Sequence, residues 1–332
     1  MAFTLDKLGS KRYNSRNTDV VRVVPQNGQE YTITPLETKL NGTPFKSWIL
    51  EPENPITPDL TVLDYGLGES GAINESEAHY IAMEGMPIAL HDTPRRQEAV
   101  SFKNWAMNPR LRKRLAQHAF NPLILPSQAT EAVVDAAQEY APAYAHVIDK
   151  TRSMGGLSGI MHAVHDERVE TVYLEAVAGL VKGHPLPGHA RGLPGIALKE
   201  IPPAVKAVMK YGPEDAVDRI MRHMGDDKLR IVREIGFLIL VRPDISRCLE
   251  ELKDRDVTVA AVYHEHDEFF PEKAMGETLE DLATRGLVHL VKRSPKTRHV
   301  FGIEQPKLSA QMYRNVITEA RQSRTVPALA HA

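Results

Sequence analysis

The sequence contains one cysteine, Cys248, and no run of about 18 apolar residues that could cross a membrane. A single cysteine cannot form a disulfide within the chain, which excludes disulfide-rich secreted scaffolds and fits a reducing compartment. Residues 1–17 are polar and basic and lack the apolar centre of a signal peptide. The two signs of charge nearly balance, with 41 Lys and Arg against 43 Asp and Glu and a formal net charge of -2. We therefore expect a cytoplasmic protein that binds neither nucleic acid nor a membrane.

The chain is long enough and apolar enough for a large packed core. Its 332 residues are 42% hydrophobic and 25% charged, which is typical of globular proteins and excludes disordered and collagen-like classes. This length accommodates one large domain with an inserted subdomain, or two smaller domains. The sequence shows no internal repeat or low-complexity tract, and it does not indicate an oligomeric state.

Strand-like and helix-like segments alternate along most of the chain. The apolar patterns predict strands at 30–40, 45–50, 61–64, 87–92, 145–149, 169–177, 257–263 and 287–291. They predict helices at about 75–84, 127–140, 156–163, 279–284 and 308–320. The first two strands flank an Asn-Gly turn signal and are expected to form a hairpin. The alternation predicts a mostly parallel sheet with helices on both faces.

Three segments fall outside this alternation. Residues 1–25 have no apolar period and are expected to form an irregular arm. The stretch 178–247 is rich in Pro and Gly and too long for a simple crossover, so we expect a helical cap there. The core would then comprise 26–177 and 248–332. A basic segment, Arg110–Arg114, is expected to be the solvated face of a helix rather than a phosphate-binding site.

The most informative motif is Lys150-Thr151-Arg152-Ser153-Met154-Gly155-Gly156, which follows the expected strand 145–149. The glycines permit a tight turn from a strand into a closely packed helix. Ligands of open parallel sheets gather outside the carboxyl ends of the strands, and such a turn would expose the Ser153 hydroxyl there. Ser-x-Gly-Gly alone is more often a helix N-cap, so its interpretation depends on residues elsewhere in the chain.

Two such residues follow later strands. A serine hydroxyl is a poor nucleophile unless a base takes its proton, and His299, after the last expected strand, is the candidate base. A carboxylate must fix the tautomer of this histidine and stabilise the imidazolium. Asp267, after the strand 257–263, is the preferred acid, and Glu175, at the end of the strand 169–177, is the alternative.

Acyl transfer also places negative charge on the carbonyl oxygen of the substrate, which needs fixed N–H donors. The backbone N–H of Met154, directly after Ser153, is one candidate. The N–H of Leu67 is the second, in the Gly-rich loop 65–70 that follows the strand 61–64. The sequence therefore predicts an oxyanion hole built from two separate loops.

Together these segments resemble the α/β-hydrolase superfamily, in particular esterase- and lipase-like serine hydrolases, over about residues 30–320. The similar segments are the oxyanion loop (65–70), the nucleophile elbow (153–156), the acid loop (264–271) and the histidine loop (298–300). Thr151 stands where the elbow of the family has its first glycine. Some members of the family place their acid where Glu175 stands.

The resemblance implies a doubly wound, mostly parallel sheet, with the helical cap inserted between the sixth and seventh core strands. It also implies hydrolysis of a carboxylic ester, thioester, amide or lactone through an acyl-enzyme on Ser153, with no metal or organic cofactor. The expected partner is a small-molecule substrate with an apolar acyl or alcohol part, because methionines in the expected cap suit an adaptable apolar lining. These are Met209, Met221 and Met224.

Other interpretations remain. An acyltransferase could use the same triad, because it differs from a hydrolase only in what attacks the acyl-enzyme. A binding protein without activity could share the fold. The run His264-Glu265-His266-Asp267 offers zinc or iron ligands, although no cysteine or third histidine stands at a suitable spacing. The run Gly66-Leu67-Gly68 lacks the third glycine of a dinucleotide-binding loop.

Overall fold

The computed structural model describes residues 20–40, 43–64, 71–91, 124–180, 245–299 and 301–325. Within them, nine strands form one sheet in the order β1-β2-β3-β5-β4-β6-β7-β8-β9. The first three of these are antiparallel to their neighbours, and the six from β5 to β9 run parallel. The strands are Val21–Val23 (β1), Tyr31–Leu40 (β2), Thr43–Pro52 (β3), Leu60–Asp64 (β4), Ile88–His91 (β5), Val147–Arg152 (β6), Val169–Glu175 (β7), Thr258–His264 (β8) and Leu290–Ser294 (β9).

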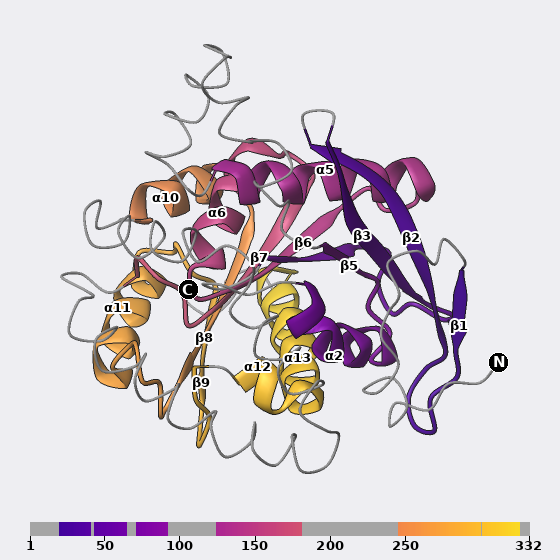
Figure 1. Ribbon diagram of the computed structural model, residues 1–332. Coiled ribbons are helices and arrows are strands. Elements are labelled where there is room, and N and C mark those ends of the chain that lie inside the picture. The colour runs from indigo at the N-terminus through magenta and orange to yellow at the C-terminus, as the bar shows by residue number, and fades with distance from the viewer. Residues whose placement is uncertain are drawn as a thin grey trace, which may run out of the picture.

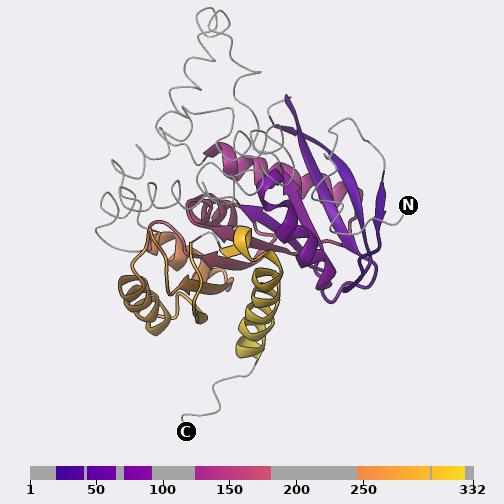
Figure 2. The same cartoon turned by 60° about the horizontal axis from the view of Figure 1, so that its bottom comes forward.

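Helices cover both faces of this sheet (Figure 1). One face carries four helices, α5 (Ile124–Tyr140), α6 (Gly155–His165), α10 (Ser246–Asp254) and α11 (Glu272–Thr284). The other face carries α2 (Gly71–Met83) and α13 (Pro306–Thr325), with the short α12 (Phe301–Glu304) just before α13. Figure 2 shows α13, in yellow, on the side of the sheet away from α5. The doubly wound, mostly parallel fold predicted from the sequence is confirmed.

The alternating side chains of each parallel strand enter two separate cores. In β8, Val259 and Ala261 belong to the core beneath α6 and α11. Ala260 and Val262 belong to the core beneath α2 and α13. Because both faces are buried, such a strand is a nearly continuous apolar run in the sequence, which is why its position could be predicted.

The hairpin is also confirmed, since β2 and β3 pair along their whole length. Other boundaries differ from the prediction. Residues 21–23, within the predicted irregular arm, form β1 at the edge of the sheet. The last strand begins at Leu290 rather than 287. Leu287 and Val288 belong to the same apolar run of the sequence, but they are buried in the segment that precedes the strand. The helices α10 and α12 were not predicted, because α10 is mostly polar and α12 has only four residues.

Most of the predicted cap, 181–244, lies outside the described residues, as do the basic segment Arg110–Arg114 and the methionines of the cap. The described ends of this stretch pack against the apolar cluster beneath α6. Ala178, Leu180 and Ile245 are buried in the cluster beneath α6.

The strand β6 extends to Arg152, beyond the predicted end at residue 149, and its polar residues Lys150, Thr151 and Arg152 are fully buried. Charged side chains are buried at low cost only when they are paired. Lys150 lies 2.9 Å from Glu77 of α2 and 3.1 Å from Glu175 of β7, and Arg152 also pairs with Glu77. We call Lys150, Arg152, Glu77 and Glu175 the buried ion cluster.

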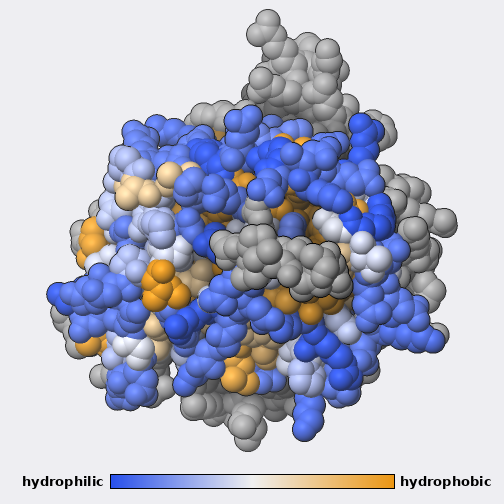
Figure 3. Space-filling view, turned by 180° about the vertical axis from the view of Figure 1, so that it is seen from behind, coloured by the Kyte–Doolittle hydropathy of each residue, from blue (hydrophilic) through white to orange (hydrophobic). Residues whose placement is uncertain are grey.

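The surface seen in Figure 3 is mainly hydrophilic, with hydrophobic residues in small separate groups. The exposed large hydrophobic residues of the described chain are Val20 and Val24 on either side of β1, Ile56 in a loop, Tyr140 at the end of α5 and Leu308 in α13. Single exposed apolar residues of this kind are normal for a folded protein. Among the described helices, none has the length and apolar character needed to span a bilayer.

Candidate active site

Ser153 forms a sharp turn between β6 and α6. Its φ angle is +52°, in the left-handed region that a residue with a Cβ adopts at a cost of about 1–2 kcal/mol. The surrounding main chain holds it there, because its N–H donates to the carbonyl of Glu175 (3.0 Å) and its carbonyl accepts from Ala178 (3.0 Å) and Gly156 (3.2 Å). A non-glycine residue held in this conformation at a strand-to-helix turn is typical of a functional site.

The glycines of α6 allow this turn by bringing the helix close to the sheet. A Cβ on Gly156 would lie 2.1 Å from Val177, and one on Gly159 would lie 2.4 Å from the Cγ2 atom of Thr151. The absence of a side chain on Gly159 therefore leaves room for the side chain of Thr151. The hydroxyl of Thr151 donates to the carbonyl of Tyr173 (2.9 Å), which also satisfies its polar group.

The backbone N–H of Met154 lies at the first turn of α6, just after Ser153. Within the described residues, this N–H donates no hydrogen bond, which leaves it available to an oxygen atom near Ser153. Helix N-termini favour negative charge. The second expected donor, Leu67, lies outside the described residues.

His299 and Asp267 are in direct contact. The Nδ1–H of His299 donates to Oδ2 of Asp267 over 2.9 Å. Oδ1 of the same carboxylate accepts from the backbone N–H groups of Phe269 (2.8 Å) and Phe270 (2.9 Å). Burial alone would raise the pKa of Asp267, but His299 and these N–H groups outweigh it and lower the pKa. An ionised Asp267 therefore fixes the tautomer of His299.

Aromatic rings hold the histidine in place. The ring of His299 lies 4.6 Å from that of Phe269 and 5.2 Å from that of Phe270, measured between centroids, and the residue is 6% exposed. The loops after β8 and β9 are joined by further contacts. The N–H of His266 donates to the carbonyl of Thr297 (2.9 Å), and Arg298 pairs with Glu268. The two loops thus act as one unit.

The order of the strands brings these three residues to one edge of the sheet. Ser153 follows β6, Asp267 follows β8 and His299 follows β9, and these strands are parallel with only β7 between β6 and β8. The carboxyl ends of parallel strands face the same side, where ligands of α/β sheets gather. The structure therefore places all three predicted residues at the same edge and brings Asp267 and His299 into contact.

The alternative acid, Glu175, has other partners. It is fully buried and lies 3.1 Å from Lys150, 3.4 Å from Arg152 and 3.4 Å from His264. Burial alone would raise the pKa of Glu175, but Arg152 and Lys150 hold it well below its usual value. The carboxylate that contacts His299 is that of Asp267.

The residues of the His264-Glu265-His266-Asp267 run also have separate partners. His264 points into the protein toward Glu175 and Thr297, and Asp267 contacts His299. The carboxylate of Glu265 accepts from the N–H of Lys296 (2.7 Å). In the described part of the chain, no group of three or more His, Cys, Asp or Glu side chains is arranged to hold a metal ion.

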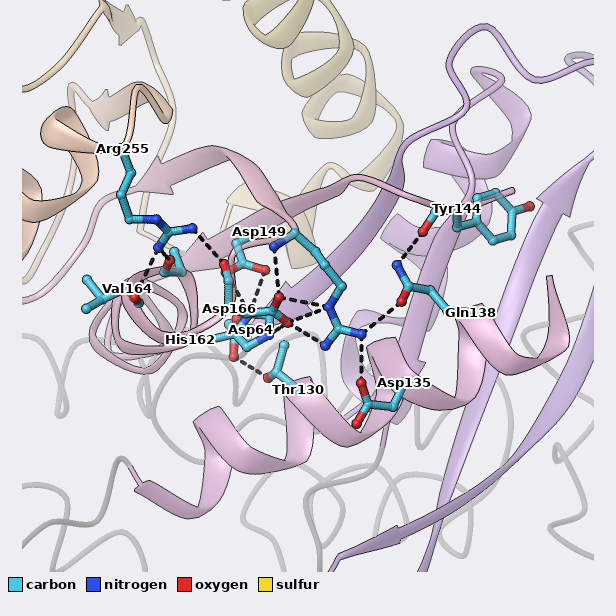
Figure 4. A network of polar contacts seen from close by, with 12 residues as sticks. Asp64, Thr130, Asp135, Gln138, Tyr144, Asp149, His162, Val164, Asp166 and Arg255 are labelled. Carbon is cyan, nitrogen blue, oxygen red and sulfur yellow. Dashed lines mark hydrogen bonds and ion pairs between the residues drawn. The ribbon is translucent and has the colours of Figure 1, made fainter. Parts of the chain in front are cut away.

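A second buried polar network lies beneath α6 (Figure 4). It occupies the face of the sheet opposite the buried ion cluster, because its strand residue Asp149 alternates with Lys150 along β6. His162 of α6 lies 2.9 Å from Asp149 of β6 and 3.1 Å from Asp166. Burial alone would lower the pKa of His162, but Asp149 and Asp166 raise it to about 10. The charged imidazole therefore ties α6, which begins just after Ser153, to the strand before it.

Asp64, the last residue of β4, belongs to the same network. Its Oδ1 accepts hydrogen bonds from Thr130 (2.8 Å) and Ser158 (3.4 Å). Burial and the nearby charge of Asp149 raise the pKa of Asp64 to about 7, and His162 offsets only part of this effect. The carboxyl group of Asp64 therefore changes its protonation state near neutral pH, at the end of β4 and just before the predicted oxyanion loop.

This exchange predicts a pH-dependent stability. The folded pKa of Asp64 lies above its ordinary value of 3.8, so between about pH 4 and 7 the folded chain holds a proton that the unfolded chain has lost. The contribution of protonated Asp64 to the free energy of unfolding is fully present below about pH 4 and is lost as the pH rises through 7. The complete loss corresponds to about 4 kcal/mol. Asp64→Asn cannot ionise, so its free energy of unfolding in urea should rise relative to wild type as the pH increases from about 4 to 7. A difference that does not vary with pH would contradict this assignment.

Sequence reasoning missed both buried networks. The ion cluster joins residues far apart in the chain, such as Arg152 and Glu77, which no local pattern connects. One signal was present, because Asp149-Lys150-Thr151-Arg152 continues directly from an apolar strand. Charges at the end of a buried strand indicate partners elsewhere in the fold.

The sequence matches no protein-family model, and the search of curated proteins finds no relative. Solved structures do match at low sequence identity. A bacterial membrane phospholipase A is 13% identical with a TM-score of 0.57, covering 88% of this chain and 87% of that one. A serine hydrolase from Cycloclasticus zankles is 14% identical with a TM-score of 0.56, covering 86% and 98%. The enol-lactonase from Burkholderia xenovorans LB400 is 15% identical with a TM-score of 0.53, covering 84% and 98%.

The chain has the α/β-hydrolase fold. The fold resemblance predicted from the motifs is thus confirmed.

Proposed function

We propose that the protein is a serine hydrolase that cleaves a carboxylic ester, thioester, amide or lactone through an acyl-enzyme on Ser153. The observation that carries this proposal is the positive φ of Ser153 at the turn between β6 and α6. A serine in this strained position of an α/β-hydrolase fold presents its hydroxyl at the carboxyl edge of the sheet. The hydrogen bond between His299 and Asp267 at the same edge supplies the oriented base that such a serine needs.

The proposed reaction follows from these roles. The Oγ atom of Ser153 attacks the carbonyl carbon while Nε2 of His299 takes the hydroxyl proton. Asp267 stabilises the resulting imidazolium through Nδ1. As the tetrahedral intermediate collapses, His299 returns the proton to the leaving group. Water then attacks the acyl-enzyme with His299 again as base, releasing the acid and restoring Ser153.

The developing oxyanion needs donors that are already in place. The N–H of Met154, at the start of α6, is suited to this role, and we assign the second donor to Leu67. Loss of one such donor typically costs about 3 kcal/mol of transition-state stabilisation. The reaction requires no metal or organic cofactor.

The structural neighbours support the class of reaction. They are named as a phospholipase A, an enol-lactonase and a serine hydrolase, and an esterase from Thermogutta terrifontis also matches, with 14% identity and a TM-score of 0.51. Three of these names, phospholipase A, enol-lactonase and esterase, denote enzymes that cleave ester-type bonds. We therefore propose a small-molecule ester or lactone as the substrate, with an apolar acyl or alcohol part.

A fluorophosphonate probe tests the proposal directly, because it phosphonylates only serines activated by a base. We expect a single adduct, located on Ser153 by mass spectrometry, in the native protein but not after heat denaturation. Ser158, five residues along α6 and buried, serves as the internal control and should carry no label. A folded protein without an adduct on Ser153 would overturn the proposed function.

A further inference from the structure

A chain of three buried side chains runs beneath the candidate site. The Oε1 atom of Glu175 in β7 lies 3.4 Å from Nε2 of His264, and Nδ1 of His264 lies 2.9 Å from Oγ1 of Thr297. His264 is 1% exposed, so the chain cannot reach a substrate itself. The chain is a carboxylate, an imidazole and a hydroxyl, and it joins β7 to the loop that carries His299.

His264 contacts both sides of that loop. Thr297 precedes His299 by two residues, and its hydroxyl also donates to the carbonyl of Ser294 (2.7 Å). Phe301 follows His299 by two residues, and its ring lies 5.7 Å from that of His264. His264 thus contacts one residue before His299 and one residue after it, so the position of the base depends on where His264 lies.

The other end of the chain reaches the nucleophile. The carbonyl of Glu175 accepts from the N–H of Ser153 (3.0 Å), while its carboxylate faces Arg152 and His264. Glu175 therefore contacts the turn with its main chain and His264 with its side chain. One continuous path joins Ser153 to the loop of His299 without passing through either reacting side chain.

We infer that His264 is a positioning residue that sets the place of His299 relative to Ser153. This inference rests on the proposed function and adds a residue that neither the triad nor the oxyanion hole includes. A shift of about 1 Å between reacting groups can lower a rate about 100-fold, so a side chain that fixes this spacing influences kcat without touching substrate. The loss should appear in kcat more than in KM, because substrate binding does not involve His264.

A buried histidine elsewhere in the protein, His79, provides a matched control. His79 of α2 is also buried and has the same kinds of partner, with Nδ1 2.7 Å from the hydroxyl of Tyr31 and Nε2 3.4 Å from Glu75. Tyr31 lies in β2, which is separated from β6 by three strands. His79→Ala removes an equivalent buried imidazole whose partners do not belong to the proposed catalytic loops.

The experiment compares His264→Ala with His79→Ala after both are shown to be folded by circular dichroism. With an ester substrate, we expect kcat of His264→Ala to fall about 10- to 100-fold with little change in KM, and kcat of His79→Ala to stay near wild type. His264→Asn, whose amide replaces Nδ1 toward Thr297, should recover part of the loss. A wild-type kcat in His264→Ala, or an equal loss in His79→Ala, would overturn the inference.

A milder variant keeps the test decisive if His264→Ala does not fold. Thr297→Val removes the hydroxyl that His264 contacts, and Thr61→Val is its control, because Thr61 is buried and bonded to Tyr313 (2.9 Å) away from these loops. We expect a lower kcat in Thr297→Val only. Normal kcat in a folded Thr297→Val would count against the inference.

A second readout does not depend on turnover. The proton between Nδ1 of His299 and Asp267 should give a downfield NMR signal, identified by its absence in His299→Ala. We expect this signal to shift or broaden in His264→Ala and Thr297→Val but not in His79→Ala. If the wild type takes no fluorophosphonate label, the proposed function fails, while the NMR signal still decides whether His264 positions His299.

Discussion

Replacing Ser153 with alanine is expected to lower kcat/KM about 10⁴- to 10⁶-fold, and His299→Ala should lower it by a similar amount. The two residues act in one step, because the serine attacks only as the histidine takes its proton. The double variant should therefore be little worse than either single variant. Steady-state kinetics with an ester substrate measure these losses, and normal turnover by either variant would eliminate the proposed triad.

Ser153→Gly is the control that separates chemistry from folding. It removes the hydroxyl and also the Cβ that makes a φ of +52° unfavourable. We expect this variant to be inactive and at least as stable as Ser153→Ala in urea unfolding. Loss of activity together with gain of stability would show that the strained conformation of Ser153 serves function.

The second large effect is expected for Asp267→Asn, which should lower kcat about 10³- to 10⁴-fold. The backbone donors of Phe269 and Phe270 bind one oxygen of the carboxylate, so the amide group of Asn would face Nδ1 of His299. This arrangement favours the wrong tautomer of His299, with the proton on the nitrogen that must act as base. The pH dependence of kcat/KM and kcat itself measure the loss.

Glu175→Gln is the comparison for this prediction, since Glu175 is the other candidate acid. Its carboxylate balances Lys150 and Arg152, so its loss should destabilise the fold by about 3–5 kcal/mol. Its effect on kcat should be much smaller than that of Asp267→Asn and should arise through His264. A mild Asp267→Asn and a severe, folded Glu175→Gln would mean that the acid is Glu175.

The fold and the candidate triad could be predicted because their signals are local. Buried parallel strands contain apolar runs in the sequence. Ser153 follows the buried strand β6 and Asp267 the buried strand β8, whereas His299 follows β9, which is mostly only partly buried. The contact between Asp267 and His299 agrees with the choice made from strand order. Thr151 stands where the elbow of the family has its first glycine, and its side chain fits because Gly159 has none. No local pattern in the sequence connects these two residues.

The supporting residues could not be predicted, because their partners are distant in sequence. The path from Glu175 through His264 to Thr297 joins three separate segments. His264 stood in the sequence as one member of a possible metal-binding run, and its direction into the protein depends on the alternation of β8. Polar side chains at strand ends can be recognised from sequence, but which of them turn inward depends on the packing of the whole sheet.

The polar end of β6 has a consequence for the register of that strand. Asp149 and Thr151 point toward α6, where Asp149 contacts His162. His162 also contacts Asp166. Lys150 and Arg152 point to the opposite face of the sheet, where both pair with Glu77. A slip by one residue would exchange the two faces and bring Asp149 toward Glu77 and Glu175. Apolar side chains tolerate such an exchange far better than buried charges do. The two opposite charge patterns therefore specify where β6 ends, and with it the single position at which Ser153 emerges from the sheet.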